Sequence, residues 1–141
     1  MIIGNVRSLN NKMDELCANV KYQHEFRNIS LMSFTETWLT DCVNDELVNI
    51  DGFKLLRGDR QCDEAMKEKE GGVCTYVNEK WCHPNNAVIK KHLCSPNSEI
   101  LITSLRPYYL PREFSNISNV IHFTVYVPNR NVARSAANEI I

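Results

Sequence analysis

The stretch that decides the fold is SFTETWLTD, from Ser33 to Asp41. An apolar run from Ile29 to Phe34 predicts a buried strand, and Glu36 follows it between two threonines. The end of a strand holds a side chain rigidly at the edge of a sheet, where clefts form in layered α/β proteins. Carboxylates in such places are common metal ligands. We therefore expect Glu36 to be a functional carboxylate; capping or solvation is the ordinary alternative.

Around this stretch, the spacing of apolar residues predicts one early helix and a series of strands. Met13, Leu16 and Val20 recur at helical spacing, which predicts a helix from Lys12 to about Phe26. Strands are predicted over residues 1–6, 29–35, 53–57, 73–77, 88–93, 99–105 and 120–127. Residues 131–141 have a helical composition. The predicted fold class is therefore α/β (α+β), mostly strands with one early helix.

The composition is typical of a globular domain. The chain has 141 residues, of which 43% are hydrophobic and 23% charged, and its net charge is -1. This balance does not indicate a nucleic-acid partner, although a local basic cluster remains compatible with one. No apolar run approaches the roughly 20 residues of a membrane helix, and the N-terminus is too soon polar for a signal peptide. We expect an intracellular protein without a membrane partner.

Three polar residues stand at predicted strand ends. Asn5 ends the first strand, Glu36 follows the second, and Tyr126 lies near the end of the last. Strand ends that share one edge of a layered fold form the usual cleft. A carboxylate with neutral donors suits a divalent-metal phosphodiester site, because Mg²⁺ prefers oxygen ligands and neutral donors stabilise developing charge. Any one of these residues alone is more often a cap or a solvated side chain.

Five segments, in this order, resemble the endonuclease domain of LINE-type non-LTR retrotransposons. They are NVRSLNNKMDEL, SFTETWLTD, IDGFKLLRGDR, GGVCTYV and VYVPNR. The resemblance extends over essentially the whole chain, more loosely from Trp81 to Ser118, and TETWL and NVRSLNNK are its most specific parts. That domain belongs to the endonuclease/exonuclease/phosphatase superfamily and is similar to apurinic-site DNA repair endonucleases. The resemblance implies the N-terminal part of a four-layer α/β sandwich.

The resemblance also implies a reaction and the residues that perform it. The family nicks DNA with Mg²⁺ (or Mn²⁺), leaving a 3′-hydroxyl that primes reverse transcription, which implies a DNA partner and a nuclear location. By matching position, Glu36 is the metal-binding carboxylate and Asn5 helps to organise the metal and phosphate site. Tyr126 is expected to hydrogen-bond the scissile phosphate. Asn129 is expected near the phosphate backbone, with an ordinary turn residue as the alternative.

Part of the family's active site is expected to be missing. In the family an Asp-x-Asn pair and a Ser-Asp-His-like element follow the tyrosine, and neither follows Tyr126. Residues 1–141 are therefore expected to be a truncated domain without its C-terminal half, inactive alone and binding Mg²⁺ weakly if at all. The superfamily core is two sheets packed face to face. We expect this chain to supply about one of them and to leave its inner face open as an apolar patch.

The segment RGDR, from Arg57 to Arg60, follows a predicted strand. The family often has an Arg-x-Asp-Arg here. Arg57 and Arg60 are therefore candidate nucleic-acid-binding residues, which contact DNA phosphates or brace the site around Asp59. An exposed cluster of ion pairs with little effect on stability is an equally good interpretation.

Two other functions stay open. The chain could be a non-catalytic remnant whose cleft binds nucleic acid or another protein. A zinc-binding protein is the third reading, with Cys74, Cys82, His83, His92 and Cys94 as ligands. Their spacing is irregular and lacks the paired short ligand loops of structural zinc sites, so we expect no structural zinc.

Overall fold

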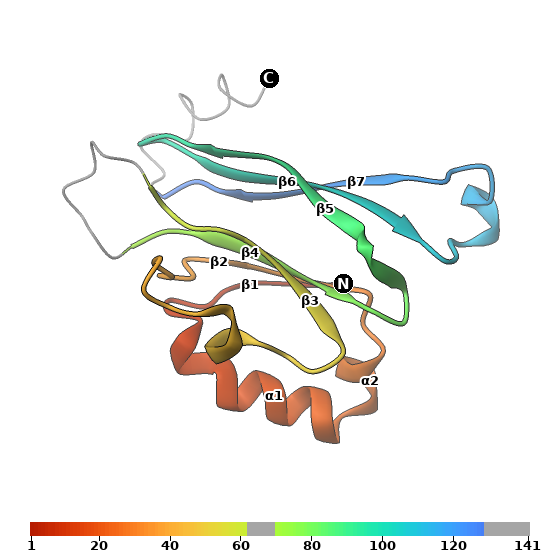
Figure 1. Cartoon of the computed structure of the whole chain (residues 1–141), viewed down its shortest axis with the longest axis horizontal. Helices are drawn as coiled ribbons and strands as arrows, with labels where there is room; N and C mark the ends of the chain where they lie inside the picture. Colours follow the sequence, from red (N-terminus) through yellow and green to blue (C-terminus); the bar gives the residue numbers. More distant parts are fainter. Residues whose placement is uncertain (62–69, 129–141) are drawn as a thin grey trace.

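Two β-sheets pack face to face, and helices cover the outer side of the first sheet (Figure 1). The structure, a computed structural model, describes residues 1–61 and 70–128. The helix predicted over residues 131–141 and the candidate Asn129 lie outside the described residues. The described chain is thus a layer of helix followed by two layers of sheet.

The first sheet contains the strands that carry Asn5 and precede Glu36. It consists of β1 (Ile2–Asn5), β2 (Leu31–Thr35), β3 (Phe53–Gly58) and β4 (Val73–Asn78), in the order β1-β2-β4-β3. β1 and β2 are parallel, whereas β4 pairs antiparallel with both neighbours. Parallel strands need a crossover, which the helical segment between β1 and β2 supplies. β4 is buried at every position because helices cover one of its faces and the second sheet the other.

The crossover contains α1 (Met13–Tyr22) and the short α2 (His24–Arg27). Met13, Leu16 and Val20 are the buried residues of α1, as the helical spacing predicts. The predicted single helix is interrupted at Gln23, whose backbone is extended (φ -107°, ψ 116°). Neither helix, nor any other in the described part of the chain, is long and apolar enough to cross a membrane.

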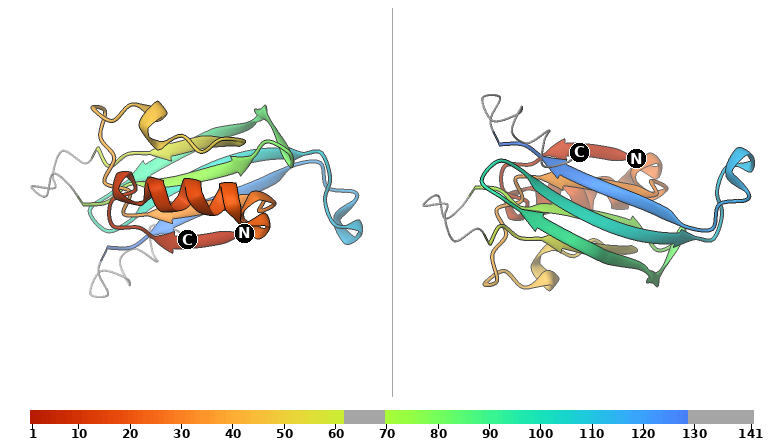
Figure 2. Two further views of the ribbon diagram at one scale, coloured as in Figure 1. Left: turned by 90° about the horizontal axis from the view of Figure 1, so that it is seen from below. Right: turned by 90° about the horizontal axis from the view of Figure 1, so that it is seen from above.

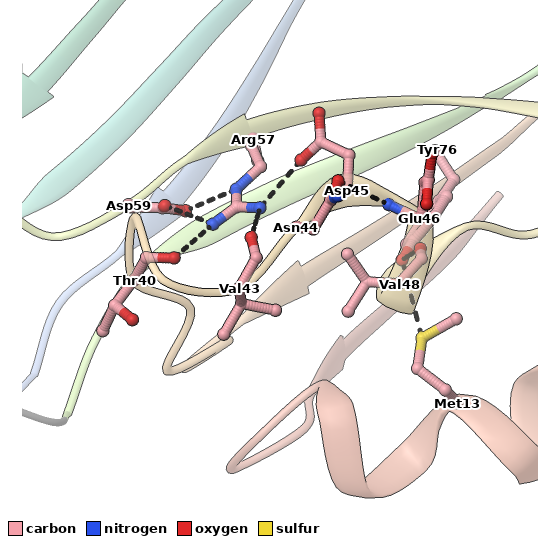
Figure 3. Close-up of polar contacts among 10 residues, drawn as sticks. All are labelled: Met13, Thr40, Val43, Asn44, Asp45, Glu46, Val48, Arg57, Asp59 and Tyr76. Carbon is pink, nitrogen blue, oxygen red and sulfur yellow. Dashed lines mark hydrogen bonds and ion pairs between the residues drawn. The ribbon is translucent and has the colours of Figure 1, made fainter.

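One core lies between the helices and the first sheet, and Tyr76 of β4 is its largest fully buried side chain. A buried phenol needs a partner for its hydroxyl group. Tyr76 donates to the carbonyl oxygen of Val48 at 2.6 Å, beside the sulfur of Met13 (Figure 3). Its ring meets that of Phe34 edge to face, with centroids 6.1 Å apart. The hydrogen bond to Val48 joins the segment after Glu36 to β4, an inner strand of the sheet.

The second sheet consists of β5 (Cys82–Cys94), β6 (Glu99–Pro107) and β7 (Val120–Tyr126), all antiparallel. A second core between the sheets includes Leu56, Val77 and Leu105. The expectation that the chain supplies about one sheet and leaves its inner face open is therefore wrong. The strands after Trp81 were expected as strands, but they pair with one another and close over the first sheet instead of extending it.

Several exposed apolar residues lie on the outer face of the second sheet. Ile121, Phe123 and Val125 alternate along β7 with the less exposed His122 and Thr124. Because successive side chains of a strand point to opposite faces, these three residues point away from the first sheet. Among the described elements, none covers this outer face, whereas α1 lies across the outer face of the first sheet (Figure 2).

A polar network also links the two sheets. Ser33 Oγ lies 3.2 Å from Thr75 Oγ1 and 2.9 Å from Nε2 of His122. Thr75 Oγ1 lies 2.8 Å from Thr124 Oγ1, which is itself 3.3 Å from the same histidine nitrogen. Each buried hydroxyl therefore has a partner, as buried polar groups generally do. The network fixes β7 over β2 and β4.

Candidate active site

The strand ends that carry the predicted site meet at one edge of the sandwich, the left edge in Figure 1. β1 and β2 are parallel and end there with Asn5 and Thr35. β7 also ends at this edge, with Tyr126 (Figure 1). Tyr126 pairs there with Glu99, the first residue of β6. Thus the first sheet contributes Asn5 and Glu36, and the second contributes Tyr126.

The backbone on either side of Glu36 is in an unusual conformation. Glu36 and Trp38 have positive φ angles of 53° and 55°, and Arg7 and Ser8 in the neighbouring loop have 44° and 88°. These are the only non-glycine residues of the described chain with positive φ. Such conformations cost on the order of 1–3 kcal/mol each and are frequent at functional sites. Their concentration in two adjacent loops marks this edge of the sheet.

Backbone hydrogen bonds hold these loops together after the strands have ended. Ser8 N–H donates to the Glu36 carbonyl at 2.9 Å, and Leu9 N–H to the Thr37 carbonyl at 2.9 Å. On the other side, Thr37 N–H donates to Gly72 O at 3.2 Å and Trp38 N–H to Gly71 O at 2.9 Å. The loop after β2 is therefore held between the loop after β1 and the glycine pair before β4. This network maintains the strained conformation of Glu36.

The side chains of Glu36 and Tyr126 are in direct contact. The Tyr126 hydroxyl group donates to Glu36 Oε1 at 2.6 Å. Burial raises the pKa of Tyr126, and its hydrogen bond to Glu36 and that carboxylate's charge raise it further. Tyr126 is thus a neutral hydrogen-bond donor throughout the physiological pH range. A donor of this kind stabilises negative charge on a neighbouring oxygen.

Asn5 lies on the same side of the first sheet as this pair. Its register partner is Thr35, the residue before Glu36, and Ile3 is paired in the same way with Ser33. Register partners point to the same face of a sheet. Ser33 points toward the second sheet, where it meets His122, so Asn5 also lies on that face. Because β1 is an edge strand, Asn5 remains exposed.

Arg7 is a charged neighbour of Glu36 that the sequence analysis did not identify. Its Nε lies 3.9 Å from Glu36 Oε2, which is too long for a hydrogen bond, and its side chain is 80% exposed. An exposed pair of this length adds little to stability. Arg7 therefore places a movable positive charge at the edge of the site.

The donor set is compatible with a hard divalent cation. Glu36 Oε2 accepts no hydrogen bond from the described residues, while Oε1 is held by Tyr126. Mg²⁺ characteristically binds one or two carboxylates and keeps several waters. Glu36 and the amide oxygen of Asn5 are suitable ligands of this kind. Within residues 1–61 and 70–128, no group of three or more His, Cys, Asp or Glu residues could hold a metal.

Arg57 connects β3 to the loop after Glu36 through hydrogen bonds of its guanidinium group. Its five N–H groups are all used within the chain, as Figure 3 shows. Two N–H groups bind Asp59 and one binds Asp45, while the other two bind the carbonyl oxygens of Thr40 and Val43. The hydrogen bond to Asp59 is the main cause of the raised pKa of Arg57. Of the two predicted roles, this arrangement favours bracing the loop after Glu36 over contacting DNA.

Arg60 lies next to a buried carboxylate that the sequence analysis missed. Arg60 Nη1 is 3.4 Å from Oε1 of Glu99, and the Glu99 side chain is only 1% exposed. The other carboxylate oxygen of Glu99 accepts the Gly72 N–H at 2.6 Å. Glu99 follows the polar residues SPNS and begins the strand predicted over residues 99–105, a position that gives no sign of a functional site. Only its register opposite Tyr126 reveals that it belongs to the site.

The candidate zinc ligands do not converge in the described structure. Cys74 belongs to the core under the helices, whereas Cys82 belongs to the core between the sheets. Both are buried free thiols. Burial raises the pKa of each, which disfavours the thiolate form that binds metal.

Comparison with known proteins identifies the fold. No protein-family model matches the chain, and no curated protein matches it either. Among solved structures, the chain is similar to the AP endonuclease LMAP from Leishmania major, with a TM-score of 0.61 and 18% identity. The match covers 95% of this chain and 42% of that one, so this chain spans less than half of its length. The chain therefore has a mixed α/β sandwich fold like that of an AP endonuclease, which confirms the predicted fold class.

Proposed function

We propose that this chain is the N-terminal portion of a Mg²⁺-dependent DNA endonuclease from a LINE-type retrotransposon. The intact enzyme would hydrolyse one phosphodiester bond of DNA and leave a 3′-hydroxyl that primes reverse transcription, in the nucleus. The AP endonuclease-like fold supports a nuclease, and the segments that resemble the LINE domain support the narrower assignment.

The observation that carries this proposal is the hydrogen bond from Tyr126 to Glu36. The two residues are 90 positions apart in sequence and come from different sheets, yet their side chains meet at 2.6 Å. Both residues stand at predicted strand ends, and the resemblance to the LINE domain implies that Glu36 is the metal-binding glutamate and Tyr126 the phosphate-binding tyrosine. The pair also lies at the positive-φ backbone of Glu36 and Trp38, and such conformations are frequent at functional sites.

Each residue of the site has a separate task in this proposal. Glu36 and Asn5 would hold Mg²⁺ (or Mn²⁺), which when bound polarises the phosphoryl oxygen. Tyr126 would turn its single O–H from Glu36 Oε1 to the scissile phosphate when substrate and metal are bound, and the neutral hydroxyl group would stabilise the charge that develops there. We propose that Arg7, which is exposed beside Glu36, contacts the DNA backbone. We propose the same contact for Asn129. Arg57 and Arg60, first considered as nucleic-acid-binding residues, hold the surrounding loops instead, and the side chain of each is only 16% exposed.

We further propose that the chain alone does not cleave DNA. The resemblance places the water-activating Asp-x-Asn pair and the Ser-Asp-His-like element after the tyrosine. Loss of a single catalytic group typically costs a factor of roughly 10² to 10⁴ in rate, and several such groups are concerned here. Residual metal binding through Glu36 is then the property that remains to be measured.

Two assays on the purified chain test the proposal. Mn²⁺ binding, followed by electron paramagnetic resonance, should be weak in the wild type and lost in Glu36→Gln. It should be unchanged in Glu113→Gln, a control at an exposed glutamate of the short 3-10 helix Arg112–Phe114. Equal Mn²⁺ binding by wild type and Glu36→Gln would instead favour a non-catalytic remnant that binds nucleic acid or protein.

In a supercoiled-plasmid assay with Mg²⁺ we expect no nicking, and Glu36-dependent nicking would overturn the proposed inactivity.

A further inference from the structure

Glu99 is a buried carboxylate that the proposed reaction does not yet use. It is the first residue of β6, directly opposite Tyr126 in the register of the second sheet. Its side chain is 1% exposed, which is rare for a glutamate. A charge in such a place is unfavourable unless paired and hydrogen-bonded, so its partners explain what it does.

The partners of Glu99 come from the first sheet. Glu99 Oε2 accepts the Gly72 N–H at 2.6 Å. Oε1 has Arg60 Nη1 at 3.4 Å but accepts no hydrogen bond from the described part of the chain, and Arg60 Nε is also buried with no partner there. Burial raises the pKa of Glu99, whereas the Gly72 N–H and Arg60 oppose that change. The carboxylate is thus held from one side and unsatisfied on the other.

Gly72 connects Glu99 to Glu36 through the backbone. The Gly72 carbonyl accepts from Thr37 N–H, and the Gly71 carbonyl accepts from Trp38 N–H. These are the two residues that follow Glu36, and Trp38 shares its left-handed conformation. The position of the glycine pair therefore determines the backbone from which the Glu36 side chain extends.

Close approach of these groups requires glycine at both positions. Gly71 and Gly72 have φ angles of 114° and 86°, which other residues rarely adopt. A side chain on Gly71 would collide with Glu99 and Arg60, and one on Gly72 with the Thr37 hydroxyl group. The glycine pair before β4 therefore allows the close approach of Glu99 as well as that of the loop after Glu36.

We infer that Glu99 is a positioning residue, which sets the orientation of both the Glu36 carboxylate and the Tyr126 hydroxyl group. It reaches Glu36 through Gly72 and Thr37, and it adjoins Tyr126 as its neighbour across β6 and β7. Arg60 forms an ion pair with the other carboxylate oxygen. This inference rests on the proposed function only in naming a metal and a phosphate as what the oriented pair binds.

The test uses Glu99→Gln, which keeps an oxygen for the Gly72 N–H but removes the charge that Arg60 holds. The first readout is the ¹³Cζ resonance of Tyr126 in tyrosine-labelled protein without metal, assigned by its loss in Tyr126→Phe. We expect Glu99→Gln to shift this resonance and to weaken Mn²⁺ binding about tenfold, as substitutions behind a metal ligand commonly do. Glu113→Gln should change neither. An unchanged Tyr126 resonance in Glu99→Gln would overturn the inference.

Two further measurements separate the possible failures. If Glu99→Gln does not fold, Arg60→Gln should also shift the Tyr126 resonance, because it removes the ion pair that fixes Oε1 of Glu99 while leaving the hydrogen bond from Gly72 in place; no shift there would overturn the inference. If the wild type shows no Glu36-dependent Mn²⁺ binding, the proposed function fails. The metal-free resonance of Tyr126 would still decide whether Glu99 positions the pair.

Discussion

Ser33 on β2 and His122 on β7 are hydrogen-bonded across the two sheets, with 2.9 Å between Oγ and Nε2. Burial lowers the pKa of His122, because desolvation disfavours the charged imidazolium. A histidine with a lowered folded-state pKa takes up a proton on unfolding when the pH is below about 6.5. The stability that it contributes is therefore present above about pH 6.5 and is lost as the pH falls below that value.

The first prediction concerns the loss of stability at low pH that the lowered pKa of His122 implies. The free energy of unfolding of the wild type should fall more steeply between about pH 7.5 and pH 5 than that of His122→Gln. Urea unfolding followed by circular dichroism at several pH values measures both slopes. Burial also lowers the pKa of His92, but that residue is present in both proteins, so the difference isolates His122. Identical slopes would contradict the prediction.

A second prediction concerns the conformation of Glu36. Its φ of 53° is unfavourable for any residue with a Cβ, and glycine avoids this cost. Glu36→Gly should therefore be more stable than Glu36→Ala by about 1 kcal/mol, although both lose Mn²⁺ binding. At Glu113, in a short helix, the order should be reversed: Glu113→Gly should be less stable than Glu113→Ala. Urea unfolding of the four variants gives the comparison, and the same order at both positions would argue against strain at Glu36.

A third prediction concerns Arg57. Lysine has a single ammonium group and cannot replace five N–H groups in a planar arrangement. Arg57→Lys should lower the free energy of unfolding by about 2 kcal/mol, because Asp59 and two carbonyl groups lose partners. Arg112→Lys, at an exposed arginine, should change it little. Chemical denaturation measures both, and equal effects would show that the Arg57 cluster is energetically unimportant.

The fourth prediction separates DNA contact from bracing. Arg7 is exposed beside Glu36, so Arg7→Gln should weaken DNA binding for all sequences and reduce the salt dependence by about one unit of slope. Arg106→Gln removes an exposed arginine near the opposite end of β6 and is the matched control. Fluorescence anisotropy with a labelled duplex over a range of salt concentrations gives the slopes. If Arg7→Gln keeps the wild-type slope, Arg7 does not contact the phosphates.

The sequence predicted much of the fold because its local patterns are strong. Met13, Leu16 and Val20 mark one face of α1, and the apolar run before Glu36 marks β2. The ends of these strands place Asn5, Glu36 and Tyr126 at one edge, which sequence periodicity can indicate. Their role in binding metal and phosphate stays a prediction.

Other features depend on pairing that no local pattern reveals. The second sheet was missed because the partners of β5, β6 and β7 are chosen by register, not by composition. β5 begins at Cys82, earlier than the predicted start at residue 88. The prediction missed its first residues because Pro84 and two asparagines interrupt the apolar pattern there, near a register shift. Glu99 and Arg7 lacked a signal for the same reason: each becomes informative only beside its neighbour from another strand.

The pairing of Tyr126 with Glu36 also determines when the site forms during folding. Contacts between residues this distant in sequence have a high cost of loop closure and tend to form late. Helix α1 and the β1–β2 pair can form before the Tyr126 hydroxyl group reaches the Glu36 carboxylate. Detachment of β7 alone would dismantle the pair and leave the first sheet intact. Hydrogen exchange should accordingly find β7 amides less protected than those of β4, because the edge strand of a sheet opens more readily than a strand paired on both sides.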